Sequence, residues 1–208
     1  MGIVHTVIKV LAGNSANNIA ASQTPGAAGN LTLTASPVVL DTSRQVLFTP
    51  AGDEASNGTV WTVYGTNGSN NAIQEAVTGV ANPATVATHQ NFKTVTRIAV
   101  NKAQAGAVTV GTNTVGATDW QSVDMMREPI NIGFSVIVAG TINYTVQTTN
   151  QDVNALGVGQ YPTTSDLAQF TALSYSTSGG ITAPVAYFRL QINSGTGTAT
   201  LVYEQAGP

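Results

Sequence analysis

Residues 58–67, GTVWTVYGTN, decide the fold of this chain, because residues 140–150, GTINYTVQTTN, repeat them one residue longer. Both stretches are rich in β-branched and aromatic residues and are bounded by Gly and Asn, which is typical of strands and hairpin turns. The simplest interpretation is one β-domain used twice. Two further phrases return in the same order: residues 97–101 (RIAVN) and 106–110 (GAVTV) come back as residues 189–193 (RLQIN) and 197–201 (GTATL).

The composition favours two folded domains with an uncharged polar surface. The 208 residues allow two domains of roughly 80 to 90 residues each. Hydrophobic residues make up 42% of the chain, which is enough to fill a core, whereas charged residues make up only 8%. An ordinary soluble domain has about 25% charged residues. A surface of Thr, Asn, Ser and Gln is desolvated at lower cost than an ionic one, so it suits a subunit packed against neighbours.

Charge and cysteine content exclude several classes of partner. The net charge is −3 with an isoelectric point near 5.1, so the basic footprint of a nucleic-acid-binding protein is missing. The sequence has no cysteine, hence no disulfide and no thiolate chemistry. No apolar run reaches the roughly 20 residues of a membrane helix, and we expect no membrane partner. Lys9 interrupts the apolar start of the chain, which predicts synthesis in the cytoplasm without an export signal.

The predicted organisation has four segments. Residues 1–35 form an extended N-terminal arm, 36–112 the first β-domain, 113–130 a linker and 131–208 the second β-domain. The arm contains low-complexity sequence that has little to bury, so its order requires partners outside it. We expect it to lie across another subunit. The alternative is an edge strand on its own domain, with Ile3, Val7 and Leu11 packing inward.

Local signals predict an all-β fold. Asn57-Gly58 predicts a hairpin turn, because both residues accept positive φ. Val95 is out of phase with the alternation that follows it, which predicts a β-bulge. Residues 165–170 predict a helical turn, but no helical period is sustained over fifteen residues. The predicted fold class is two tandem antiparallel β-sandwiches, of jelly-roll or immunoglobulin-like type, with the extended N-terminal arm.

Few residues offer chemistry near neutral pH. His5 and His89 are the histidines of the chain, and both are expected to be solvated or interfacial. Asp53 and Glu54 are adjacent carboxylates that fit a glycosidase or a calcium ligand, but a solvated turn explains them more simply. The chain also lacks a nucleophile elbow, a phosphate-binding loop and a dinucleotide fingerprint.

A second acidic group lies between the copies. Asp119, Asp124 and Glu128 meet around a cation only if the linker curls. The sequence therefore predicts no catalytic residue, no cofactor and no metal site, and hence no enzyme.

Matched aromatic and basic residues predict a scaffold. Trp61 and Tyr144 occupy equivalent places in the repeat and are predicted core positions. Arg97 and Arg189 also match, and each is expected to brace a neighbouring loop through bidentate hydrogen bonds. Contacts with other subunits are then expected where the copies differ: in the arm, the linker and an insertion at residues 152–180. The candidate contact residues are Ile3, Val7, Leu11, Trp120, Met125, Met126 and Tyr161.

Several phrases resemble those of tailed-bacteriophage virion proteins, and together they span about residues 46–205. In those proteins similar phrases belong to β-sandwich domains of head-decoration, cement or tail-associated subunits. The resemblance implies a non-enzymatic structural role and supplies no catalytic residue. The phrases are residues 48–52 (FTPAG), 75–79 (EAVTG), 92–96 (FKTVT), 108–112 (VTVGT), 138–146 (VAGTINYTV) and 193–201 (NSGTGTATL).

The role that this resemblance favours is head decoration. It implies a location on the capsid exterior, with the major capsid protein and further copies of the chain as partners, the copies forming a trimer. One alternative is a tail- or fibre-associated subunit that binds host glycans through Tyr161, Tyr175 or Trp120. A β-fold glycoside hydrolase and a bacterial surface adhesin are two others.

Overall fold

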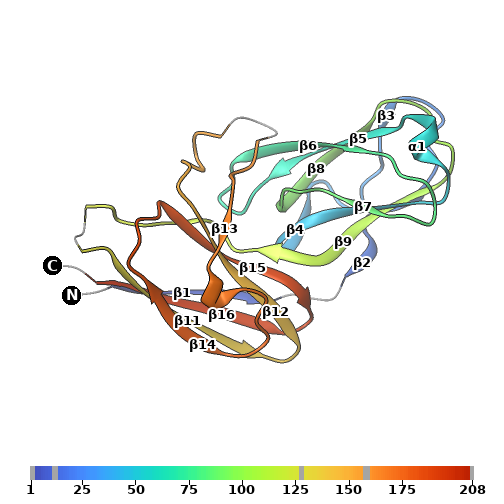
Figure 1. Cartoon of the computed structure of the whole chain (residues 1–208). Coiled ribbons are helices and arrows are strands. Elements are labelled where there is room, and N and C mark those ends of the chain that lie inside the picture. The colour runs from blue at the N-terminus through green and yellow to red at the C-terminus, as the bar shows by residue number, and fades with distance from the viewer. Residues whose placement is uncertain (1–2, 11–13, 127–128, 157–159, 207–208) are drawn as a thin grey trace. The chain divides into compact units, whose positions relative to one another are not determined.

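The computed structural model describes residues 3–10, 14–126, 129–156 and 160–206 (Figure 1). In these residues the regular structure consists of antiparallel strands, one four-residue helix, α1 (Glu54–Asn57), and one 3-10 turn, η1 (Ala168–Phe170). The prediction of an all-β fold is confirmed, and η1 falls in the predicted helical turn. The tandem-sandwich arrangement stays a prediction.

The chain divides into two compact units. We call residues 13–113 the N-terminal unit, and residues 114–208 together with 1–12 the C-terminal unit. The chain passes from one to the other within strand β9 (Val108–Ala117).

In the N-terminal unit, neighbouring strands follow the order β9-β4-β8-β5-β6. Strand β5 shows why this sequence forms a sheet, because its residues alternate between buried and half-buried along its whole length. Three shorter pairings add β2 to β9, β3 to β8 and β7 to β4. The strands are β2 (Ser15–Gln23), β3 (Gly29–Asn30), β4 (Val38–Pro50), β5 (Val60–Thr66), β6 (Ala72–Thr78), β7 (Val86–Ala87) and β8 (Phe92–Val100).

In the C-terminal unit, one group of strands follows the order β13-β12-β15 and continues to the end of β9, with β10 paired to β15. A separate four-stranded sheet has the order β1-β16-β11-β14. The strands are β1 (Ile3–Val10), β10 (Gln121–Ser122), β11 (Asn131–Ala139), β12 (Ile142–Thr149), β13 (Ser165–Asp166), β14 (Thr177–Ile181), β15 (Tyr187–Gly195) and β16 (Thr198–Ala206).

Each unit has its own aromatic-centred core. Trp61 is fully buried in the N-terminal unit and stacks on Phe48, with ring centroids 4.7 Å apart. Tyr144 is fully buried in the C-terminal unit, where Phe134 and Phe188 meet edge to face at 4.8 Å. The prediction that Trp61 and Tyr144 are core positions is confirmed.

The repeat in the sequence is a repeat in strand pairing. Strand β5 pairs with β8 in the N-terminal unit, and β12 pairs with β15 in the C-terminal unit. The central strands β9 and β16 are also equivalent, since β9 lies between β2 and β4 and β16 lies between β1 and β11. The register agrees residue by residue: Trp61↔Val100 and Tyr64↔Arg97 in one unit, Tyr144↔Ile192 and Gln147↔Arg189 in the other.

The predicted bulge in β8 is confirmed. Tyr64 pairs with Arg97, but the next residue, Gly65, pairs with Val95, so Thr96 is the extra residue. Its hydroxyl donates to the Tyr64 carbonyl at 3.1 Å. The bulge explains why Val95 and Ile98 are both buried although their spacing breaks the period of two.

The predicted hairpin turn at Asn57-Gly58 is wrong. Residues 54–57 form helix α1, and Gly58 ends it in the left-handed conformation, with φ of 67°. The helix forms because the Asp53 carboxylate caps it by accepting from the Ser56 N–H at 3.0 Å. Gly58 thus provides the positive φ that was expected, but at a helix C-cap.

The first 35 residues contain strands paired within the chain, as expected from the alternative of an edge strand. β1 pairs with β16 of the C-terminal unit, whereas β2 and β3 pair with β9 and β8 of the N-terminal unit. The physical reason is that Ile19, Ala20 and Leu31 are apolar enough to be buried in the core of the N-terminal unit. The predicted linker also contains strand, namely the end of β9 and all of β10.

Candidate functional site

One candidate contact residue of the arm, Ile3, and two of the linker, Met125 and Met126, lie toward the same end of β16. Gln205, near the end of this strand, is in register with Ile3 at the start of β1. The Gln205 side chain also holds Asp124: it accepts from the Asp124 N–H at 3.0 Å and donates to the Asp124 carbonyl at 2.7 Å. Two segments that lie more than a hundred residues apart in sequence therefore meet at this glutamine.

Two exposed methionines follow directly. Met125 is 48% exposed and Met126 is 91% exposed. The Asp124 carboxylate accepts from the Met126 N–H at 3.0 Å, which fixes the turn that presents them. An unbranched, polarisable thioether adapts to irregular partner surfaces, so exposed methionines suit a protein contact. We call Met125, Met126 and Gln205 the methionine corner.

The other candidate contact residues have different positions. Trp120 is half-buried, and the Arg189 guanidinium lies over its ring at 4.5 Å, so this tryptophan is part of the scaffold of the C-terminal unit. Tyr161 is 56% exposed. Val7 is in register with Leu201 in β16. Leu11 lies outside the described residues.

Arg97 and Arg189 each contact a residue of the strand that pairs with their own. Arg189 donates from Nε and Nη2 to the Gln147 side-chain carbonyl, at 3.0 and 2.8 Å. Desolvation lowers the pKa of Arg189 to about 10, partly offset by the negative charge of Asp166. Arg97 instead lies over the Tyr64 ring in β5 at 3.8 Å, a cation–π contact. Gln147 lies in β12, so the prediction that these arginines brace loops is wrong: both contact a neighbouring strand, and Arg189 alone does so through two hydrogen bonds.

The Asp53-Glu54 pair has a structural role. Glu54 is fully buried, and its carboxylate accepts from the Thr59 hydroxyl at 2.6 Å and from the Gly106 N–H at 2.9 Å. Burial acts to raise the pKa of Glu54, but the hydrogen bonds, with that of Thr59 the strongest, hold it below its usual value. The pKa of Asp53 is lowered by the hydrogen bond from the Ser56 backbone. The expectation of a solvated turn is therefore wrong for Glu54, and a fully buried carboxylate cannot reach a polysaccharide.

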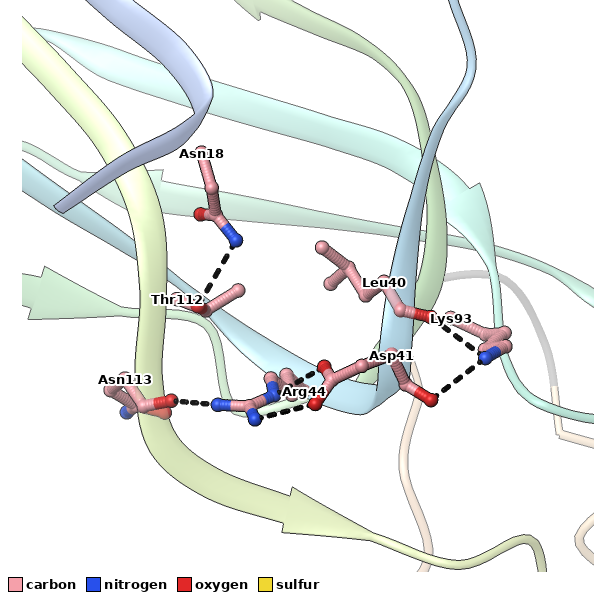
Figure 2. A network of polar contacts seen from close by, with 7 residues as sticks. All are labelled: Asn18, Leu40, Asp41, Arg44, Lys93, Thr112 and Asn113. Atoms are coloured by element: carbon pink, nitrogen blue, oxygen red, sulfur yellow. Dashed lines mark hydrogen bonds and ion pairs between the residues drawn. The ribbon is translucent and has the colours of Figure 1, made fainter. Parts of the chain in front are cut away.

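A polar network that sequence reasoning missed lies along β4 (Figure 2). Arg44 is 1% exposed and forms a bidentate ion pair with Asp41, at 2.8 and 2.7 Å. Its Nη1 also donates to the Asn113 carbonyl at 2.9 Å, and Lys93 donates to the Leu40 and Asp41 carbonyls at 2.7 and 3.2 Å.

This network supports an irregular stretch of sheet. The pairing of β4 with β8 jumps from Val39↔Thr94 to Arg44↔Phe92. Extra residues on β4 leave main-chain carbonyls outside the ladder, and Lys93 satisfies two of them. The only sequence signal was an Asp three residues before an Arg, which is common on surfaces and does not reveal burial.

Glu75 organises a second polar cluster. Its carboxylate accepts from the main-chain N–H groups of His89 and Gln90, at 2.7 and 2.8 Å. The His89 ring is largely exposed and meets the same carboxylate at 2.9 Å. The prediction of a solvated histidine is confirmed for His89.

The described residues were also searched for a metal site and for a membrane-spanning helix. Within the part of the chain that the structure describes, no three His, Asp or Glu side chains gather closely enough to hold a metal ion. Asp119 and Asp124 belong to that part, whereas Glu128 lies outside it. None of its helices has the length and apolar character needed to cross a membrane.

Comparison with known proteins assigns the chain to no family. No protein-family model matches the chain, and no curated protein matches it. Among solved structures, the crystal structure of the major capsid protein P2 from Bacteriophage PM2 aligns over 98% of this chain and 97% of that one. The sequence identity is 11% and the TM-score is 0.25, which is too low to carry an argument about fold or function.

Proposed function

We propose that this chain is a non-enzymatic structural subunit of a bacteriophage virion. The observation that carries the proposal is the kind of residue that the repeat preserves. Trp61 and Tyr144 are buried anchors, and Arg97 and Arg189 stabilise neighbouring strands. The matched residues of the two copies therefore support the fold, and no pair of reactive side chains is among them.

Within the virion we propose a head decoration, or cement, protein that binds across joints between major capsid proteins. Only 8% of the residues are charged, so polar β-surface can be buried on both sides of a joint without burying charged side chains that lack an ionic partner. Many weak contacts in a repeating shell then add through avidity. The two methionines of the methionine corner, together with Tyr161, are the exposed candidates for contact with the shell.

The first experiment asks whether purified virions contain the protein, by mass spectrometry of particles banded on a density gradient. Presence at a copy number comparable with the capsid protein supports the proposal, and absence from the particles contradicts it.

A binding experiment then tests the contact surface. Particles lacking the protein are incubated with the wild-type chain or with a Met125→Ser, Met126→Ser double variant, and the bound fraction is measured by sedimentation. We expect the double variant to bind at least tenfold more weakly. The matched control is Val39→Ser, which changes a 64% exposed residue in the N-terminal unit and should leave binding unchanged.

A glycan-binding tail or fibre subunit is the second candidate, favoured by two exposed aromatic rings. Tyr161 is 56% exposed and Tyr175 is 61% exposed, and such rings can stack on sugars. Retention of the protein on host-surface glycans, lost in a Tyr175→Ala variant, together with its location in isolated tails, would favour this candidate over decoration.

A further inference from the structure

We propose that β1 is an exchangeable strand, which pairs with β16 of a second copy of this chain as well as with its own. The inference rests on the proposed function for its setting, since an assembly of many copies holds the chains at high local concentration.

The first argument is connectivity. β1 belongs by its contacts to the C-terminal unit, yet the chain continues from it into β2 of the N-terminal unit, with only residues 11–14 between the two strands. The rest of the C-terminal unit begins a hundred residues later, at residue 114. No local loop therefore ties β1 to the sheet that it completes.

The second argument is its position in the sheet. β1 lies at the end of the order β1-β16-β11-β14, and its eight residues pair in unbroken register with β16. An edge strand can leave without disturbing any other ladder, and an identical strand from a second copy restores the same hydrogen bonds. Exchange of an identical element is therefore a low-cost route to association.

The third argument comes from the equivalent strand in the other unit. β2 occupies the same place beside β9 as β1 does beside β16. It is an integral part of its unit, because Ile19 and Ala20 are fully buried in the core. Each unit thus needs a strand at this edge, and in both cases the first 23 residues supply it.

Exchange predicts a specific contact between copies. The chain has no cysteine, so a disulfide between two introduced cysteines reports this contact, and no native thiol competes with it. Thr6 in β1 is in register with Val202 in β16, and Val202 is in register with Ser135 on the opposite side, in β11. Thr6 and Ser135 are thus two strand spacings apart, about 9.5 Å, which exceeds the Cα separation of about 4.4–6.8 Å that a disulfide spans.

The experiment mixes purified Thr6→Cys and Val202→Cys proteins at high concentration, oxidises them and measures the disulfide-linked heterodimer by mass spectrometry. The matched control mixes Thr6→Cys with Ser135→Cys. Circular dichroism checks that each variant is folded. We expect at least tenfold more heterodimer from the first mixture.

The chain carrying both Thr6→Cys and Val202→Cys reports pairing within one molecule. If it forms its internal disulfide while the two mixtures give equal heterodimer, β1 pairs only with its own chain and the proposal is overturned. Failure of both disulfides also overturns it, because the register would then be absent in solution. The experiment uses no virions, so its failure and that of the proposed function are distinguishable.

Discussion

The two units share the pairing of their repeated strands, but they differ in the connection that leads into the first of these strands. In the N-terminal unit, the connection from β4 to β5 contains helix α1 and the buried Glu54. In the C-terminal unit, the equivalent connection from β11 to β12 is a short turn at Gly140, with φ of 79°.

In each unit the equivalent loop packs against this connection: the loop from β8 to β9 in the N-terminal unit and the loop from β15 to β16 in the C-terminal unit. Gly106 lies so close to Gly52 that a Cβ would meet the Gly52 backbone at 2.6 Å, and at Gly197 the backbone of Ala139 blocks the same space. The comparison teaches that close backbone packing defines the end of the unit, while the means of holding it varies: a hydrogen-bonded carboxylate in one copy and a tight turn in the other.

The largest expected effect tests whether the repeated cores are energetically equivalent. Trp61→Ala and Tyr144→Ala each leave a large cavity at a fully buried position, so each should lower the free energy of unfolding by about 3–5 kcal/mol. Urea denaturation followed by circular dichroism measures both. A loss below about 1 kcal/mol at either position would break the equivalence.

A milder variant at Tyr144 separates the effect of side-chain volume from that of the hydroxyl group, with the same urea denaturation as the measurement. The Tyr144 hydroxyl donates to the Tyr175 carbonyl at 3.0 Å, so Tyr144→Phe should cost about 0.5–1.5 kcal/mol.

An effect smaller than that of Trp61→Ala is expected at the connection found only in the N-terminal unit. Glu54→Gln weakens the hydrogen bonds from Thr59 and Gly106, and at pH 7 it should cost about 1.5–3 kcal/mol. Asp53→Asn is the matched control, because Asn caps a helix as well as Asp does, and it should cost less.

The pH dependence has a definite sign. The pKa of Glu54 is lowered on folding, so the unfolded chain binds the proton more tightly and stability falls as the pH drops below 4.5. Glu54→Gln should flatten this acid limb. Wild-type and variant curves that remain parallel from pH 6 to pH 3 would show that Glu54 does not contribute to it.

The sequence was sufficient for features that depend on local patterns. The β-branched and aromatic residues within 58–67 predicted β5, the phase break at Val95 predicted the bulge, and the repeat predicted equivalent aromatic anchors. The first two of these are encoded within a few neighbouring positions, and the third is visible as soon as the sequence is compared with itself.

Features that depend on distant partners could not be predicted. Nothing within residues 3–10 indicates that they pair with residues 198–205. The burial of Arg44 and Glu54 depends on Asn113 and Gly106, which lie more than 50 residues away in the sequence. The methionine corner is a further example, because Gln205 reaches Asp124 only through the fold.

The smallest expected effect is the difference in stability between alanine variants of the two glycines at the start of the repeat. Gly58 and Gly140 both have positive φ, so alanine at either position should cost about 1–2 kcal/mol from backbone strain. A Cβ at Gly58 would meet only the end of the flexible Lys102 side chain, at 3.5 Å, whereas one at Gly140 would meet the Gly197 backbone at 3.2 Å. Gly140→Ala should therefore be the more destabilising variant. Gly133→Ala is the control within a strand, because its Cβ finds nothing closer than 3.9 Å and its φ is not positive, so it should be neutral or slightly stabilising. Thermal unfolding of the three variants measures the order, and a larger loss at Gly58 than at Gly140 would show that helix α1 constrains its unit more tightly than the short turn does.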